Sequence, residues 1–304
     1  MIGASGFVGG ALVAELAKYG HDVTGTSRSG EGSLEKLDLE RPDPVAALLA
    51  RAEPQAIVNL AGPASVAASW RQPELAFRGN TAATATLLEA IASAAPGAHL
   101  VIASSAAVYG RPASMDQAPF TEQDPLVPAS PYAASKAAAE ILVAESERRT
   151  GLKASVLRLF NQVGPGQPDS QASSEFAREI AAAEQRGDSS VAIEIGNPRA
   201  CRDYTDVRET AAAVRLIIEG GITGRINVCS GRPTGLSEIA AGLAGLTRTK
   251  VEVIDKSERA HPQDIDLVAG DPSKLNAATG WKPGMTLGKS LADLLGYWRI
   301  RLAA

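Results

Sequence analysis

The chain has 304 residues, of which 45% are hydrophobic and 21% charged, and its formal net charge is −4 at pH 7. This balance predicts a soluble globular protein of one large or two modest domains, and the mild acidity argues against nucleic acid or an anionic membrane as a partner. No apolar run is long enough to span a bilayer and no basic, apolar leader opens the chain, so we expect a cytoplasmic protein. Two cysteines and three scattered histidines predict neither a disulfide framework nor a metal site.

The chain opens with the pattern G-x-x-G-x-x-G over residues 3–9, which leads into a helix expected to end near Gly20. Glycines at this spacing let backbone N–H groups and a helix N-terminus approach a pyrophosphate. A buried strand has to feed such a turn, and only two residues precede it, so whether a strand precedes Met1 stays open. The residues expected to bind a dinucleotide here are Gly3, Ser5, Gly6, Phe7, Val8 and Gly9.

A second strand is expected over residues 22–26, followed by Ser27-Arg28-Ser29. An acidic residue at this place would accept hydrogen bonds from ribose hydroxyls and select NAD, whereas an arginine with hydroxyl neighbours suits a 2′-phosphate. We therefore expect NADP(H), with NAD(H) as the alternative if Arg28 is only a solvated loop residue. A short third strand is expected over residues 37–39, where Asp38 and Leu39 would lie near the adenine.

Two continuous apolar runs, residues 56–60 and 100–103, are typical of buried parallel strands. The first is followed by a helical pattern over residues 73–95. The second delivers two serines at the carboxyl edge of the sheet, where ligands bind in open α/β sheets, although a serine at a strand end is often only a turn residue. From these segments we expect cofactor contacts by Ala61, Gly62, Asn80 and Ser104, and a substrate contact by Ser105.

Residues 110–128 are rich in Pro and Asp without periodicity, and they predict a long active-site loop. In the helix that follows, Ser130 is a good N-cap and Pro131 a good first residue. Tyr132 and Lys136 then share one face of this helix. The ammonium and the helix dipole are expected to lower the pKa of the phenol, which would make it a proton shuttle. On spacing alone, a surface tyrosine beside a solvated lysine is an equal alternative.

A strand over residues 153–159 follows, and the loop 160–168 then breaks the alternation of strands and helices. The pattern predicts an α/β protein with a Rossmann-type doubly wound parallel sheet and a smaller C-terminal α/β domain. We expect residues 1–160 and about 205–230 to form the cofactor domain. Residues 161–204 and 231–304 are expected to form the substrate domain.

The second half predicts a helix over residues 174–185, a strand over 191–195, and a charged turn over 199–207 that enters a helix ending near residue 219. Arg199 and Arg202 in this turn are candidates for a substrate phosphate, because a planar guanidinium matches phosphate oxygens. A structural Arg–Asp pair is the alternative.

Several motifs follow one another along the chain: Gly3/Gly6/Gly9, Ser105 in S-A-A-V-Y-G, Tyr132/Lys136, Asn161, Arg202-Asp203-Tyr204 and the tail from Asp271 to Pro283. Together these motifs resemble the extended short-chain dehydrogenase/reductases, the NAD-dependent epimerase/dehydratase family that acts on nucleotide sugars. The resemblance covers nearly the whole chain. It implies that Tyr132 exchanges a proton with the sugar 4-oxygen, that Ser105 binds the same oxygen, and that Lys136 holds the nicotinamide ribose while hydride moves between nicotinamide and C4. It also implies a cofactor contact by Phe160 and substrate contacts by Asn161 and Arg259.

Departures from the family narrow the implied reaction. Sugar 4,6-dehydratases carry an acidic residue shortly after the catalytic hydroxyl, where this chain has Ala106 and Ala107. Epimerase-reductases that make fucose nucleotides add a cysteine and a histidine, and neither Ala106 nor Gln162-Val163 can serve. The resemblance therefore implies NADPH-dependent reduction of a nucleotide-linked 4-keto-6-deoxyhexose. Segments 161–167 and 196–207 are most similar to the GDP-mannose branch, whose reductases make GDP-rhamnose.

Two other functions remain open from the sequence. One is a 4-epimerase with retained NAD, and the other is a non-catalytic regulator that senses NADP(H). The alanine-rich helical segments 80–95 and 133–149 also predict a homodimer through a four-helix bundle, because relatives commonly pair through these helices. Small residues on those helices could equally face the sheet.

Overall fold

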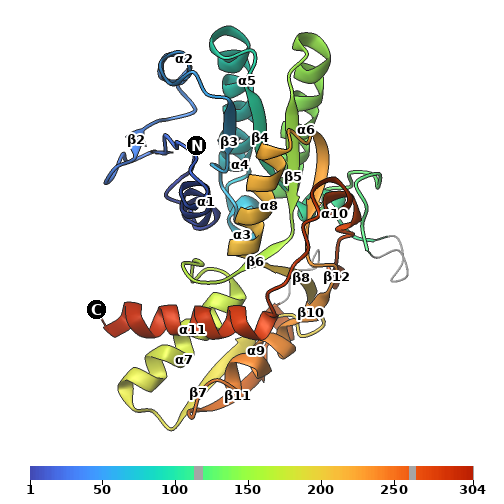
Figure 1. The fold of residues 1–304 in the computed structure, drawn as a ribbon. Coiled ribbons are helices and arrows are strands. Elements are labelled where there is room, and N and C mark those ends of the chain that lie inside the picture. Colours follow the sequence, from blue (N-terminus) through green and yellow to red (C-terminus); the bar gives the residue numbers. More distant parts are fainter. Residues whose placement is uncertain (113–118, 260–264, 304) are drawn as a thin grey trace.

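The computed structural model describes residues 1–112, 119–259 and 265–303. Its larger part is a parallel sheet with helices on both faces, so the predicted fold class is confirmed (Figure 1). Ile2 bridges the two halves of this sheet, because it pairs in parallel with Thr26 on one side and Asn59 on the other. The strand order is β2 (Glu35–Lys36), β1 (Thr26–Ser27), Ile2, β3 (Ala56–Asn59), β4 (His99–Ser105), β5 (Ala154–Leu159) and β9 (Gly224–Val228).

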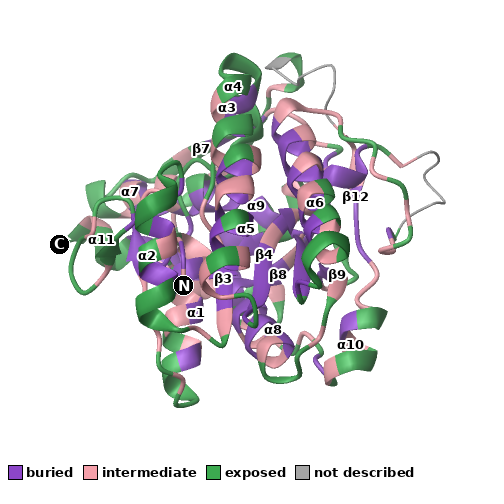
Figure 2. Ribbon diagram, turned by 90° about the horizontal axis from the view of Figure 1, so that it is seen from above, coloured by how far each residue is buried: buried purple, intermediate pink, exposed green. Residues whose placement is uncertain are grey.

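Alternate residues of the central strands pack into two separate cores. In β4, Leu100 and Ile102 join the core beneath α2 (Pro42–Ala52), α5 (Ala83–Ala94) and α6 (Pro131–Thr150). Val101 joins the opposite core beneath α1 (Phe7–Lys18) and α8 (Val207–Glu219). Because successive side chains point to opposite faces, both faces must be apolar, which explains the continuous apolar runs. Figure 2 shows these buried strands enclosed by helices with exposed outer faces.

The strands at one edge of the sheet are shorter than expected. The strand expected over residues 22–26 is only Thr26–Ser27, and its neighbour lies at Glu35–Lys36 rather than at residues 37–39. Leu37 and Leu39 are buried in the core without being strand residues. The pairing with β1 reaches Leu37, whose N–H donates to Ser27 O at 2.8 Å, and the alternating burial that predicted a strand continues past it to Leu39.

The helix expected over residues 73–95 has a different geometry in its middle. It consists of α4 (Pro73–Ala76), the π-helical turn η1 (Phe77–Ala82) and α5, and a further short helix, α3 (Val66–Arg71), precedes it. A π-turn inserts one extra residue and changes which side chains face inward. Asn80 is buried in this turn.

The smaller part of the molecule is built around β8 (Cys201–Asp206), where the sequence predicted a charged turn. Asp203 and Thr205 are buried while Arg202 and Tyr204 are partly exposed, so burial alternates along the segment as in a strand. The buried positions are polar residues, which do not give an apolar alternation in the sequence. The expected loop 160–168 also contains a strand, β6 (Asn161–Val163), which pairs with β8. The other partners of β8 are β10 (Pro233–Gly235) and β12 (Leu267–Val268).

A third core lies among three helices of this part and a parallel pair of strands. Ile180, Ile239 and Leu294 are fully buried there. The division into two domains stays a prediction, and Leu275 and Trp281, which the sequence places with the substrate domain, pack in the core beneath α1 and α8. The elements around the third core are α7 (Ala172–Arg186), α9 (Leu236–Ala244), α11 (Leu287–Ala303), β7 (Ser190–Ile195) and β11 (Lys250–Asp255). A further helix, α10 (Ser273–Thr279), lies between β12 and α11 in the chain.

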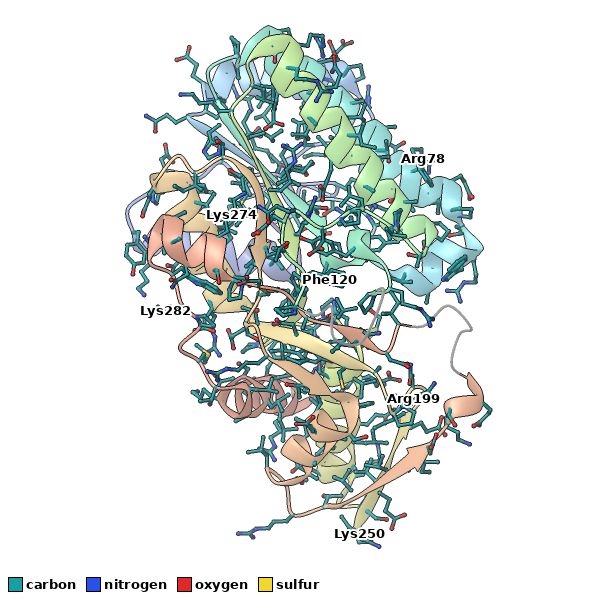
Figure 3. All side chains as sticks on the ribbon, turned by 90° about the vertical axis from the view of Figure 1, so that its right-hand side faces the viewer. Arg78, Phe120, Arg199, Lys250, Lys274 and Lys282 are labelled. Carbon is teal, nitrogen blue, oxygen red and sulfur yellow. The ribbon has the colours of Figure 1, made fainter. Side chains whose placement is uncertain are left out.

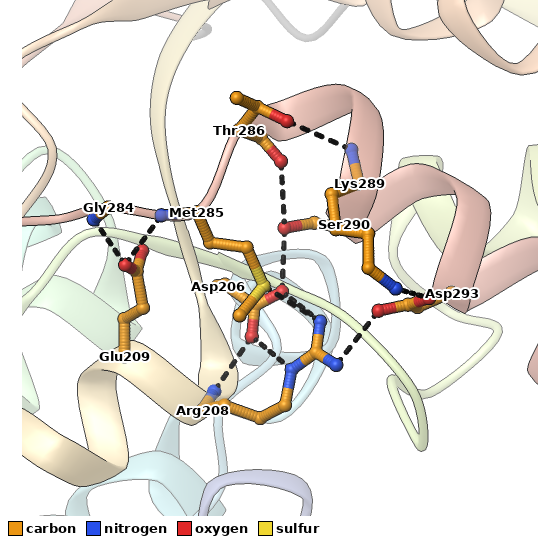
Figure 4. Close-up of polar contacts among 9 residues, drawn as sticks. All are labelled: Asp206, Arg208, Glu209, Gly284, Met285, Thr286, Lys289, Ser290 and Asp293. Atoms are coloured by element: carbon orange, nitrogen blue, oxygen red, sulfur yellow. Dashed lines mark hydrogen bonds and ion pairs between the residues drawn. The ribbon is translucent and has the colours of Figure 1, made fainter.

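Figure 4 shows the contact that joins α8 to α11. Arg208 donates to Asp206 through Nε and Nη2, both at 2.8 Å, and its Nη1 lies 2.8 Å from Asp293 Oδ2. Ser290 Oγ donates to Asp206 Oδ2 at 2.6 Å, and Glu209 accepts from the backbone N–H of Met285 at 2.7 Å. The charged residues before and at the start of α8 therefore serve to hold the C-terminal helix. No helix among the described residues is long and apolar enough to cross a bilayer.

The glycine turn is closely packed where the sequence predicts it. Gly3 has φ +82°, and a Cβ there would lie 2.8 Å from the Ala61 nitrogen. A Cβ on Gly9 would lie 2.1 Å from the Gly3 carbonyl oxygen. Gly6 precedes α1 in an extended conformation, and no side chain caps the helix. The turn therefore brings backbone close to backbone and presents the start of α1, an arrangement that suits a phosphate.

Gly9→Ala should lower the free energy of unfolding by about 1–3 kcal/mol, because the added methyl group collides with backbone that cannot give way easily. Gly10→Ala is the matched control, since nothing lies within 4 Å of a Cβ at that position of the same helix. Alanine there should leave stability unchanged or raise it by about 1 kcal/mol. Urea unfolding measures both, and equal stabilities of the two variants would contradict the close packing.

Candidate active site

Helix α6 begins and ends as predicted. Ser130 Oγ accepts a hydrogen bond from the Ala133 N–H at 3.2 Å, Pro131 is the first helical residue, and Gly151 ends the helix with φ +73°. Tyr132 and Lys136 are both buried on the face that packs against β4. The surface alternative for this pair is therefore wrong.

Ser105 and Tyr132 meet at the carboxyl end of β4. The side chains of Ser105 and Tyr132 share a hydrogen bond. Ser105 Oγ also accepts from the Ala107 N–H at 3.2 Å, because Ser105 caps the short 3₁₀ turn Ala106–Tyr109. This second bond fixes the hydroxyl through the backbone, so Ser105 presents a preset oxygen to the phenol.

The pKa of Tyr132 moves in the opposite direction to the one expected. Burial raises the pKa of the phenol, and the hydrogen bond with Ser105 lowers it by less. The sequence argument fails because burial of the phenol has the largest effect on its pKa, and the Lys136 ammonium donates to the Ala103 carbonyl at 2.9 Å. Tyr132 is therefore protonated at neutral pH, which is the state that a proton donor needs.

Lys136 is buried beside this phenol. Burial lowers the pKa of its ammonium to about 8, and the negative charge of Glu140 opposes that shift. A lysine with a pKa near 8 is still mostly charged at neutral pH. The site thus offers a neutral acid and a cation side by side.

Asn80 supplies an unsatisfied polar atom at the edge of the same site. Its Nδ2 donates to Pro63 O at 3.1 Å and to Ser135 Oγ at 3.0 Å, and Ser135 Oγ donates to Tyr132 O at 2.7 Å. Asn80 Oδ1 is buried without a partner among the described residues. A Cβ on Gly62, at φ +139°, would lie 2.3 Å from this oxygen. A buried acceptor beside a bare backbone fits a bound hydroxyl or amide.

The loop after β1 holds Arg28 in an exposed position. Ser27 Oγ accepts from the Gly30 N–H at 2.9 Å and lies 3.4 Å from Ser29 Oγ, so this hydroxyl shapes the loop. Asp38 is half-buried and accepts from the Glu40 N–H at 3.0 Å. Ser5 is exposed, whereas Phe7, Val8 and Ala61 are partly buried.

Three residues expected to touch a cofactor have side chains used elsewhere. Leu39 is buried in the core beneath α2 and α5. Phe160 is buried in an apolar cluster with Tyr109, and its ring packs directly on Gly270, where an added Cβ would lie 2.4 Å from the ring. Ser104 Oγ donates to Glu140 behind the strand. Any contact that these residues make with a ligand would have to come from their backbone.

Apart from Ser105, the expected substrate residues belong to the smaller part. Asn161 is exposed at the start of β6, opposite Tyr204 of β8. Arg202 Nη1 donates to Cys201 O at 2.9 Å and to Asp266 O at 3.3 Å. Arg199, labelled in Figure 3, has an 81% exposed side chain whose Nε lies 3.8 Å from Asp266 Oδ2. The backbone of Arg259 closes a short 3₁₀ turn, and its side chain lies outside the described residues.

The sequence did not identify a group of buried polar residues behind the site. The group consists of Glu140, Arg158, Tyr109 and Asn227, joined by side-chain hydrogen bonds. The sequence did contain one indication of Glu140, which follows Lys136 by four residues, as Lys136 follows Tyr132. This spacing places all three side chains on one face of the helix. The partners on β5 and β9 could not be read from the sequence, since they meet through tertiary pairing.

Comparison with known proteins agrees with this arrangement. Residues 1–294 match the family model described as GDP-mannose 4,6 dehydratase. A GDP-6-deoxy-D-mannose reductase of Pseudomonas aeruginosa is 32% identical over 301 residues, covering 99% of this chain and 96% of that protein. The solved structure of RMD from Pseudomonas aeruginosa complexed with NADPH is similar with a TM-score of 0.87, at 31% identity and with 99% and 98% of the two chains covered.

A second solved structure extends the comparison to another reaction. The UDP-glucose 4-epimerase of Thermus thermophilus in complex with NAD has a TM-score of 0.85, at 27% identity and with 98% and 97% of the two chains covered. The family model and the reductase both span nearly the whole chain, so the resemblance inferred from the motifs is confirmed. The chain belongs to the GDP-mannose 4,6 dehydratase family, within the extended short-chain dehydrogenase/reductases.

Proposed function

We propose that the protein uses NADPH to reduce the 4-keto group of a nucleotide-linked 4-keto-6-deoxyhexose, with GDP-4-keto-6-deoxy-D-mannose as substrate and GDP-D-rhamnose as product. The observation that carries the proposal is the buried phenol of Tyr132, which is hydrogen-bonded to Ser105 at the carboxyl end of β4. The next two residues after Ser105 are alanines, and Tyr109, at the end of the turn that follows, is buried with its hydroxyl bonded to Arg158 and Asn227. Carbonyl reduction needs only one proton donor.

The side chains divide the work around the sugar 4-oxygen. Tyr132 donates its proton to this oxygen, and Ser105 holds the oxygen in place by a hydrogen bond. Lys136 contributes a positive charge that stabilises the developing alkoxide and then the phenolate. Bound NADPH supplies the hydride to C4. One hydride and one proton convert the carbonyl to a hydroxyl group.

The cofactor would lie along the carboxyl edge of the sheet. The glycine turn and the start of α1 suit the pyrophosphate, and Asn80 Oδ1 offers an acceptor next to Gly62. Arg28 follows β1 with serines on both sides, which suits a 2′-phosphate. The other cofactor contacts predicted from the sequence stay proposals.

The nucleotide diphosphate of the substrate would lie between the two parts of the molecule. Arg199 and Arg202 bring two guanidinium groups to the start of β8, and Arg259 belongs to the segment that leads toward β12. Asn161 lies on β6, which pairs with the same strand. The guanidinium groups are better matched to phosphate oxygens than to an uncharged ligand.

A 4-epimerase with retained NAD is the second candidate, supported by the likeness to a UDP-glucose 4-epimerase. It would use the same Ser105, Tyr132 and Lys136, so the catalytic residues do not distinguish it. Arg28 favours an exchangeable NADPH and thus the reductase. A non-catalytic NADP(H) sensor fits least, because it would leave the assembled catalytic residues without a use. The cytoplasmic location stays a prediction from the sequence.

We also propose a homodimer through α5 and α6. The outer stripe of α6 carries Ala134, Ala138 and Ile141, and Ile141 is 64% exposed. Phe77, at the start of η1, is also exposed. Small residues around one large apolar side chain allow two copies of these helices to approach closely.

Purified protein should consume NADPH only when a 4-keto-6-deoxy nucleotide sugar is supplied, with the GDP-linked sugar turned over fastest. Tyr132→Phe should lower kcat at least about a hundredfold, because general acid catalysis contributes about 10²–10⁴. The assay compares GDP-, dTDP- and UDP-linked substrates with NADPH and NADH. Absence of NADPH loss with every one of them, or interconversion of UDP-sugars without net cofactor consumption, would overturn the reductase.

Arg28→Ala should raise the Kd for NADPH about tenfold or more and leave that for NADH nearly unchanged, since a hydrogen bond to a charged group contributes about 1.5–3 kcal/mol. Arg248→Ala removes an exposed arginine from the smaller part and serves as the control. Fluorescence titration with each cofactor gives the constants. Equal losses for both cofactors would contradict a 2′-phosphate contact.

Ile141→Glu should convert the dimer to a monomer at micromolar concentration, because it places a charge in an apolar interface. Ile300→Glu is the matched control, since Ile300 is 75% exposed on α11 and lies outside the proposed interface. Light scattering reports the mass of each. A wild-type protein that is already monomeric would rule the interface out.

A further inference from the structure

A buried ion pair lies directly behind the catalytic residues. Glu140 Oε2 is 2.8 Å from Arg158 Nη2, Arg158 Nε donates to Glu140 Oε1 at 3.2 Å, and the two side chains are only 4% and 5% exposed. Burying two charges costs about as much as their attraction returns, so such a pair is weak evidence for a role in stability alone. Its position therefore calls for another explanation.

Glu140 continues the catalytic face of α6. Tyr132, Lys136 and Glu140 follow one another at intervals of four residues, and all three are buried. Residues at this spacing are neighbours on one side of a helix. The carboxylate is thus one turn beyond the ammonium, on the side away from the phenol.

The same carboxylate also holds the end of β4. Ser104 Oγ donates to Glu140 Oε1, and Ser104 pairs with Arg158 across β4 and β5. The residue before Ser104 is Ala103, whose carbonyl accepts from Lys136 Nζ at 2.9 Å. The residue after it is Ser105. Three successive positions of β4 therefore contact Lys136, Glu140 and Tyr132 in turn.

Arg158 is fixed from its other side, which leaves the carboxylate little freedom. Its Nη1 donates to Tyr109 OH at 2.9 Å, and its guanidinium lies 4.8 Å from the centre of the Tyr109 ring. Tyr109 OH donates in turn to Asn227 Oδ1 at 2.6 Å. Tyr109 also stacks on Phe120 with ring centres 4.7 Å apart, and Phe120, labelled in Figure 3, is bound through its backbone to Ala269.

We propose that Glu140, clamped by Arg158, is a positioning residue for the reaction: its charge keeps Lys136 an ammonium, and its bond to Ser104 fixes the strand end that presents Ser105. The inference rests on the proposed use of Ser105 and Lys136, and it adds a residue that touches neither substrate nor cofactor. A buried lysine loses its proton readily, so a fixed negative charge nearby is what preserves the cation.

The electrostatic surroundings of Lys136 support this role. Burial lowers the pKa of Lys136 to about 8, and Glu140 supplies the opposing charge. Without Glu140 the pKa would fall further, so the cation would be lost at a lower pH. The other titratable groups on elements packed against α6 are Tyr109, Arg158, the exposed Arg71, Glu74, Arg78 and Glu89, His99 at the far end of β4, and Arg225, which pairs with Glu147.

Glu140→Gln keeps the shape of the side chain and removes its charge. In protein labelled with ¹³C-lysine, the Lys136 Cε signal, assigned by its absence from Lys136→Met, should titrate with a midpoint near 8 in the wild type. In Glu140→Gln the midpoint should move toward acid by about one unit. The alkaline limb of the kcat/KM profile should move in the same direction.

Glu147→Gln is the matched control. Glu147 lies on the same helix and pairs with Arg225 at 2.7 Å, but it is 11 residues beyond Lys136, about 16 Å along the axis. It should leave both the titration and the pH profile unchanged. Glu140→Asp keeps the charge, so its Lys136 midpoint should lie closer to that of the wild type than to that of Glu140→Gln. Its kcat should still be lower than that of the wild type, because the shorter side chain holds Ser104 less well.

The double variant Glu140→Gln/Arg158→Gln covers the case in which a lone buried guanidinium prevents folding. It removes both charges, and it should still shift the Lys136 midpoint toward acid, by less than the single variant. A wild-type midpoint in both variants would overturn the proposal and leave Glu140 a structural residue. Since the titration needs neither substrate nor cofactor, a failed reductase assay with a shifted midpoint would refute the proposed function alone.

Discussion

The carboxyl end of β4 has to bury several polar groups at once, and each of them must find a partner there. An unpaired buried donor or acceptor costs about 1–3 kcal/mol, and an unpaired charge costs more. The fold meets this constraint by giving Lys136 a carbonyl, Ser104 a carboxylate and Ser105 both a backbone N–H and the Tyr132 phenol. The position of α6 along β4 is therefore set by hydrogen bonds as well as by apolar packing. This placement brings Ser105, Tyr132 and Lys136 together.

Much of the architecture follows from local sequence. The ends of α6 were predictable because Ser130 and Gly151 act through their own backbone and immediate neighbours. The glycine turn was predictable because only glycine fits where backbone meets backbone. In contrast, β8 was missed because its alternation is carried by Asp203 and Thr205, whose burial depends on partners such as Ser230 and Gly231 that lie far away in the sequence.

The candidate site shows the same limit. Spacing identified Tyr132 and Lys136, but the direction of the phenol's pKa depends on burial and on where the ammonium binds, which only the tertiary structure gives. The π-turn that buries Asn80 and the commitment of Ser104 to Glu140 are also tertiary effects. Composition and motif order therefore predicted which residues gather at the site better than they predicted what each side chain contacts.

The reaction proposed for the site is a plain carbonyl reduction with Tyr132 as the proton donor. Its most direct test follows deuterium from NADPH labelled at both positions of nicotinamide C4 into the sugar product by NMR, together with a parallel reaction of unlabelled NADPH in D₂O. We expect one deuterium at C4 of each product molecule in the first reaction, and no carbon-bound deuterium in the second once substrate exchange is subtracted. Product without deuterium at C4, or deuterium entering C3 or C5 from solvent during turnover, would contradict it.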